Sequence, residues 1–104
     1  MDVNFPQFIL AYDAMTDLQK EEFIAQSIGK WVDWNGNVEE VATNSTVTIK
    51  IPGNEDWRII LKEVPRETAI TLEKDKYIHF VGHIKSISDF FGMRIYLDQV
   101  TIKQ

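Results

Sequence analysis

Residues Lys74–Thr101, KDKYIHFVGHIKSISDFFGMRIYLDQVT, carry the clearest fold signal in the chain. Apolar and polar residues alternate in two runs, the period of a β-strand with one face toward a core. The short connection Ser88–Gly92 predicts that the two runs pair as an antiparallel hairpin. Gly82 interrupts the first run and predicts a bend. The alternation assigns these residues to the interior: Ile78, Phe80, Ile84, Ile95 and Leu97.

Three earlier runs have the same two-residue period: residues 30–39, Thr46–Ile51 and Asp56–Val64. Gly36 lies in the middle of the first run and predicts a bulge or a sharp bend, which a long strand of a small barrel needs. The turn composition of Pro52–Glu55 predicts that the second and third runs form an antiparallel hairpin.

Helical periodicity is confined to the N-terminus. Apolar side chains recur at three- and four-residue spacing in residues 5–15, and Thr16 with Gln19 matches a capping box that would begin a helix over residues 17–27. One kinked helix and two short helices both fit this pattern. The second helix is expected to bury Phe23, Ile24 and Ile28. For residues 65–73, a short helix and an irregular loop fit equally well.

Composition limits the class of protein. A chain of 104 residues is expected to form one domain, here a helical extension over 1–28 and a barrel over 29–104. The absence of cysteine excludes disulfides and thiolate metal sites. No apolar run approaches the length of a membrane span and the start lacks a basic signal segment, so we expect a cytoplasmic protein that does not bind membranes.

The charge is uneven along the sequence. The net charge of −5 argues against broad, nonspecific nucleic-acid binding. Residues 1–45 hold eight acids against two lysines, whereas the remainder holds eight acids and nine bases. A local basic face is therefore compatible with the sequence, although a basic protein is not.

Helices followed by five strands, with a glycine-bent first strand, predict an OB-fold barrel. The residues that carry a family resemblance are FILAYDAMTDLQKEEFIAQSIGKWVDWNGNVEEV, LEKDKYIHFVGHIKSI and IYLDQVTI. In these segments the chain resembles the tRNA_anti-like group of OB-fold proteins. The expected fold is mainly β: a five-stranded antiparallel OB-fold barrel after one kinked or two short helices. The resemblance implies binding of nucleic acid.

In an OB-fold, oligonucleotides bind across the second and third strands, between two flanking loops. Cations there would follow the phosphate backbone, and aromatic rings would stack on bases. Phe90 and Phe91 supply rings in the loop before the last strand, although one of them is expected to plug the barrel end. The full candidate set is Thr48, Lys50, Arg58, Ile60, Lys62, Phe90, Phe91 and Arg94.

The remaining aromatic and histidine residues favour structural roles. Trp34 and Trp57 share the parity of their strands' apolar residues and are expected in the core. Trp31 has the opposite parity, and packing beneath the helices is favoured over a binding platform. His79 and His83 are four strand residues apart, about 13 Å, which is too far for one metal ion.

No catalytic motif is present: the sequence has no cysteine nucleophile, no Gly-x-Ser-x-Gly elbow and no phosphate-binding glycine loop. We therefore expect a non-catalytic module without cofactor or metal, a monomer or a weak homodimer. Single-stranded DNA or RNA is the first expected ligand. The alternative is a protein-interaction or accessory domain that binds no nucleic acid.

Overall fold

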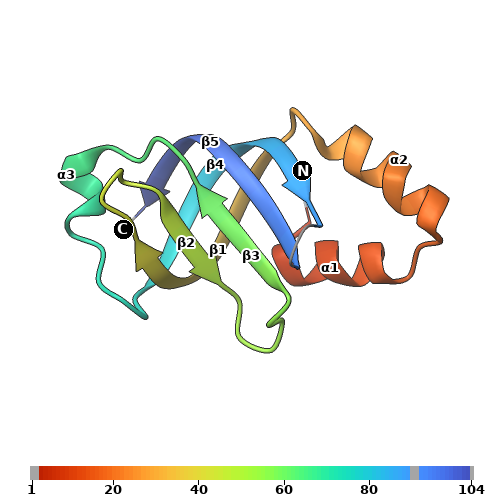
Figure 1. Cartoon of the computed structure of the whole chain (residues 1–104), viewed down its shortest axis with the longest axis horizontal. Coiled ribbons are helices and arrows are strands. Elements are labelled where there is room, and N and C mark those ends of the chain that lie inside the picture. The colour runs from red at the N-terminus through yellow and green to blue at the C-terminus, as the bar shows by residue number, and fades with distance from the viewer. Residues whose placement is uncertain (1–2, 90–91, 104) are drawn as a thin grey trace.

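The computed structural model describes residues 3–89 and 92–103 (Figure 1). Two N-terminal helices are followed by three strands, a short helix and two long strands. The elements are α1 Phe5–Asp13, α2 Asp17–Ser27, β1 Trp31–Val41, β2 Val47–Lys50, β3 Trp57–Leu61, α3 Arg66–Ala69, β4 Tyr77–Ser88 and β5 Met93–Lys103.

The five strands form a closed barrel in the order β1-β2-β3-β5-β4, and β4 pairs with β1 to complete the ring. This strand order is that of an OB-fold, as the sequence predicts. The expectation of a purely antiparallel barrel is wrong, because β3 and β5 run parallel. Directions cannot alternate around a closed ring with an odd number of strands, so at least one neighbouring pair must be parallel.

The barrel interior contains the residues that the two-residue period assigns to it. Along β1 the burial alternates strictly from Trp31 to Val38. Gly36 leaves room for a close approach of its neighbours: a Cβ there would stand 2.4 Å from Ile49 Cγ2. The five hairpin residues assigned to the interior are all buried: Ile78, Phe80, Ile84, Ile95 and Leu97.

Helix α1 closes one end of the barrel with an aromatic cluster. The Phe5 ring lies 4.8 Å from that of Trp34 and 5.7 Å from that of Trp57, between ring centroids. Phe8 packs on the same two indoles. The indole Nε1 of Trp34 donates a hydrogen bond to the carbonyl of Val3 at 3.0 Å. The two tryptophans are therefore core residues, as expected, and α1 is part of the same core.

Helix α2 is separate from α1 and begins at the predicted capping box, in which Thr16 and Gln19 bond reciprocally. Phe23 and Ile24 pack partly against the core. The expectation that Ile28 is buried is wrong, because 42% of this residue is exposed. It follows the last residue of the helix in extended backbone, so its side chain leaves the helix face that Phe23 and Ile24 share.

The ambiguous segment between β3 and β4 contains α3, a single helical turn that buries Ala69. None of the helices in the described part of the chain is long and apolar enough to cross a membrane.

Candidate functional site

The outer face of β2, β3 and β5 brings three cations into one row. Lys50 on β2 is the register partner of Arg58 on β3, and Arg58 is in turn the partner of Arg94 on β5. Neighbouring strands lie about 4.8 Å apart, so the row spans roughly 10 Å across the sheet. The sequence predicts all three residues as candidates, and the parallel pairing of β3 with β5 places Arg94 in the same row.

Tyr96 lies beside this row and was missed by the sequence analysis. It is the register partner of Ile60, whose other partner is Thr48. Its neighbours Ile95 and Leu97 are fully buried, so the half-buried tyrosine faces outward. The ammonium of Lys62 stands 5.2 Å from the centre of its ring. The alternation along β5 predicts that Tyr96 faces outward, but it does not predict that Tyr96 lies next to β3.

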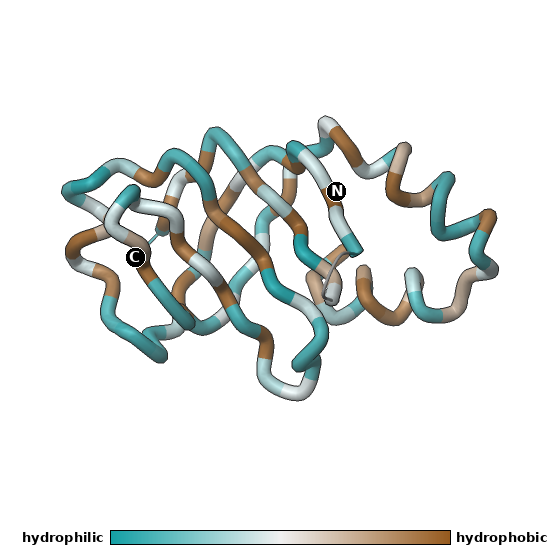
Figure 2. The backbone as a smooth tube through the Cα atoms, viewed as in Figure 1, coloured by the Kyte–Doolittle hydropathy of each residue, from teal (hydrophilic) through white to brown (hydrophobic). Residues whose placement is uncertain are grey.

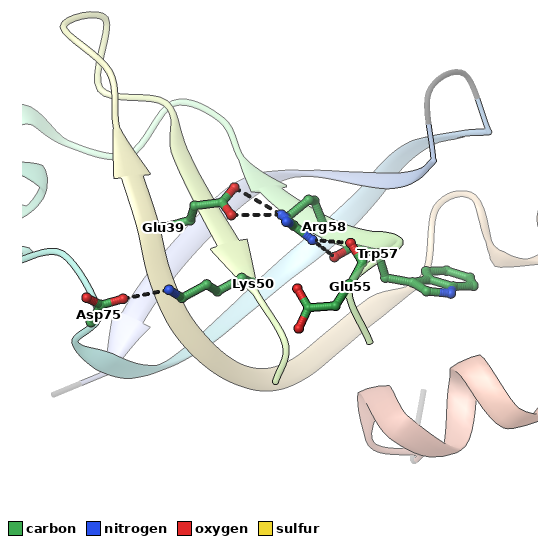
Figure 3. Close-up of polar contacts among 6 residues, drawn as sticks. All are labelled: Glu39, Lys50, Glu55, Trp57, Arg58 and Asp75. Carbon is green, nitrogen blue, oxygen red and sulfur yellow. Dashed lines mark hydrogen bonds and ion pairs between the residues drawn. The ribbon is translucent and has the colours of Figure 1, made fainter. Parts of the chain in front are cut away.

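Arg58 is held by four hydrogen bonds (Figure 3). Its Nε donates to both carboxylate oxygens of Glu39, at 2.9 and 3.1 Å. Its Nη1 donates to the carbonyls of Glu55 and Trp57, at 2.7 and 2.9 Å. A guanidinium has five N–H groups, and these bonds use three of them. Among the described residues, only the two N–H groups of Nη2 are left for a ligand.

Lys50 is also paired, on the other side of the face. Its Nζ donates to Asp75 Oδ1 at 2.6 Å (Figure 3). This hydrogen bond holds the pKa of Asp75 below its usual value and raises the pKa of Lys50 above its own. The side chains are 36% and 68% exposed, so solvent weakens the attraction and a competing anion can reach it.

Ile60, one of the candidate binding residues, is buried. It was expected to face outward and contribute to a site; it shares the outward side of β3 with Arg58, but only 8% of it is exposed. It occupies the central strand of the face, between Thr48 and Tyr96, where neighbouring side chains exclude solvent. Phe90 and Phe91 lie outside the described residues, so their predicted roles stay predictions.

Arg94 and Lys62 differ from the other two cations of this face. Both are half-buried, and neither forms an ion pair within residues 3–89 and 92–103. The face therefore combines two cations that are held by carboxylates with two that have no carboxylate partner among the described residues, around one tyrosine ring.

Two histidine–aspartate pairs lie on a different part of the barrel, across β4 and its neighbours. His79 Nε2 contacts Asp33 of β1, and this hydrogen bond holds the pKa of Asp33 below its usual value. His83 Nδ1 lies 2.9 Å from Asp98 Oδ1 on β5. In the described part of the chain, no three histidine or carboxylate groups come together as a metal site.

Trp31 adjoins the second pair, with its ring 5.4 Å from that of His83. It is 48% exposed, so the expected packing beneath the helices is wrong. The aromatic residues of α1 pack on the inward-facing tryptophans, and Trp31 points to the other side of β1.

Comparisons with known proteins support the fold. No family model matches the sequence, and a search of curated proteins gives no match. A candidate nucleic acid-binding lipoprotein from Klebsiella pneumoniae is similar in structure, with TM-score 0.69 and 16% identity over 98% of this chain and 92% of that chain. The hypothetical protein YgiW from E. coli has TM-score 0.49 and 12% identity, covering 97% of this chain and 88% of its own. At 16% identity the likeness to the Klebsiella protein concerns the fold alone.

Proposed function

We propose that this protein is a non-catalytic binding module that takes single-stranded nucleic acid across the outer face of β2, β3 and β5. The observation that carries the proposal is the row Lys50–Arg58–Arg94 next to the Tyr96 ring. Single-strand binders combine cations that follow the phosphate backbone with aromatic rings that stack on bases. The OB-fold binds oligonucleotides on this face, and a structural neighbour is described as a candidate nucleic acid-binding lipoprotein.

The paired carboxylates set how strong such binding can be. A phosphate entering the row would compete with Glu39 for Arg58 and with Asp75 for Lys50. Arg94 and Lys62 would be engaged without that competition. Tyr96 offers a ring for one base, and such stacking contributes about 1–3 kcal/mol. We therefore expect modest affinity that depends strongly on salt.

The test is a fluorescence anisotropy titration of a labelled short oligo-dT. If three phosphates are neutralised, the slope of log K against log salt is about −2, and a fourfold rise in salt weakens binding roughly twentyfold. Absence of binding at low salt would refute the proposal.

Variants locate the face. Arg94→Gln, Lys62→Gln and Tyr96→Ala should each weaken binding several-fold, whereas Glu39→Gln should strengthen it by releasing Arg58 from a competing carboxylate. Lys103→Gln is the matched control, because it removes a cation that lies beside Asp33 on β1 instead. Equal losses of oligo-dT affinity in Lys103→Gln and Arg94→Gln would show that the oligonucleotide does not bind specifically to this face.

A further inference from the structure

Helix α2 extends away from the barrel (Figure 1) and packs against the core through Phe23 and Ile24, which are only partly buried. Only Ser27 of its 11 residues is buried. The helix nevertheless carries apolar positions, which appear as brown segments between teal ones in Figure 2. Most helices of soluble proteins bury their apolar residues against a core. A helix that leaves part of its apolar face exposed is typical of one that binds a partner.

A groove of about 450 Å³ runs along this helix. Three apolar side chains line it, and one of them, Leu18, is 71% exposed. The lining is mainly apolar, with a carboxylate and two amides contributing the polar part. The lining residues are Met15, Leu18, Gln19, Glu22, Phe23 and Gln26. An apolar floor with a polar edge is the arrangement in which an amphipathic helix docks.

The charge of the helical pair decides what kind of partner fits. Residues 5–28 contain four acids and one base, a net charge of −3. The one base, Lys20, has its ammonium 5.0 Å from the ring centre of Tyr12. The helical pair of a second copy would place acidic surface against acidic surface, and an anionic membrane would be repelled in the same way. A cationic partner is attracted.

We propose that this groove, which we call the α2 groove, docks a basic amphipathic segment of a partner protein. An apolar side chain of that segment contacts Leu18 and Met15, and a lysine or arginine beside it pairs with Glu22. The α2 groove lies on the helices, whereas the proposed nucleic-acid face lies on the strands. The inference therefore stands without the proposed function.

The probe is a fluorescein-labelled helical peptide of leucine and lysine in an amphipathic pattern. A scrambled peptide of the same composition and a leucine–glutamate peptide of the same pattern serve as controls. Two-dimensional amide NMR of the full chain reports where the peptide binds. Only the amphipathic cationic peptide should bind, and the shifts should centre on residues 15–26. Equal binding of the scrambled peptide would overturn the proposal, because the acidic helices would then attract any cationic peptide regardless of its pattern.

Leu18→Gln is the decisive variant, and the chain offers a matched control. Leu10 on α1 is exposed to the same degree, 70% against 71%, but does not line the groove. Loss of one leucine contact should weaken peptide binding about tenfold in Leu18→Gln. Leu10→Gln should leave it unchanged. Both residues are exposed, so we expect both variants to fold, and equal affinities would overturn the proposal. Oligo-dT binding should be the same in both.

Discussion

At the scale of single residues, the outer face of β2, β3 and β5 separates cations that hold the fold from cations that are available to a ligand. Arg58 bonds to the carbonyls of Glu55 and Trp57, and so fixes the turn that precedes β3. Its replacement would disturb that turn as well as any ligand contact. Arg94 and Lys62 have no such backbone bonds among the described residues, which makes them the cleaner positions at which to measure binding.

The Lys50–Asp75 pair gives a pH-dependent contribution whose sign is fixed by its two pKa shifts. The pKa of Asp75 in the folded protein is below its ordinary 3.8, so this contribution is lost as pH falls through that lowered value. The pKa of Lys50 is above its ordinary 10.5, so the contribution is present below 10.5 and is lost as pH rises through the raised value.

We therefore expect Asp75→Asn to lower the thermal midpoint slightly at neutral pH and to approach the midpoint of the unmodified protein as pH falls through the lowered pKa of Asp75. Thermal melts followed by circular dichroism, at neutral and at acidic pH, measure the two midpoints. Glu73→Gln is the control, because it removes a nearby exposed acid that forms no ion pair with another described residue. A deficit of Asp75→Asn that persists at low pH would show that the effect does not come from the ion pair.

At the scale of elements, the alternation predicts which face most strand residues take and the short turns predict the two hairpins β2–β3 and β4–β5, but neither pattern predicts which strands pair to close the ring. Alternation alone places Ile95 and Leu97 inside and Arg94 and Tyr96 outside, and the structure confirms the buried pair. Whether β5 adjoins β3 depends on ring closure, which involves residues more than 30 positions apart. That pairing brings Tyr96 next to the candidate cations, so the sequence names the cations of this face as candidates but not the ring beside them.

Glu39 shows the same limit on a smaller scale. The β1–β2 register shifts between Val38 and Glu40, which marks Glu39 as a bulge residue. Its carboxylate reaches Arg58, 19 positions away. A two-residue period assumes an unbroken ladder, and a bulge breaks it. The partner of Arg58 could therefore not be read from the alternation pattern.

The close approach of residues 49–51 to Gly36 of β1 is the element-scale feature with the clearest energetic consequence. A Cβ at this position would stand 2.4 Å from Ile49 Cγ2, 2.9 Å from Ile51 Cδ1 and 3.1 Å from the Lys50 carbonyl oxygen. Gly36→Ala should cost about 1–3 kcal/mol in the free energy of unfolding, measured by urea denaturation. Gly82→Ala should cost less, because its nearest contacts are at 3.2 Å. The reverse order would contradict this account of the barrel wall.

At the scale of the whole molecule, the two helices play different parts. The sequence divides the chain into an extension over 1–28 and a barrel over 29–104, but α1 contributes Phe5 and Phe8 to the buried core. Both rings pack on Trp34 and Trp57. Helix α2 contributes little to that core, so the molecule is a barrel closed by one helix and extended by another.

This difference predicts that residues 29–104 do not fold cooperatively by themselves. Removing Phe5 and Phe8 uncovers two indoles and leaves Trp34 Nε1 without its acceptor, the Val3 carbonyl. Loss of a single buried phenylalanine costs about 3–5 kcal/mol, and the stability of a domain this size is about 5–15 kcal/mol. Two such losses would remove most of the stability of the domain. The 104-residue chain with Leu18→Gln, which is altered only at an exposed position of α2, should keep its sharp urea transition and its near-ultraviolet circular dichroism. The shortened chain should lose both, and a sharp transition in residues 29–104 would show that the barrel folds without α1.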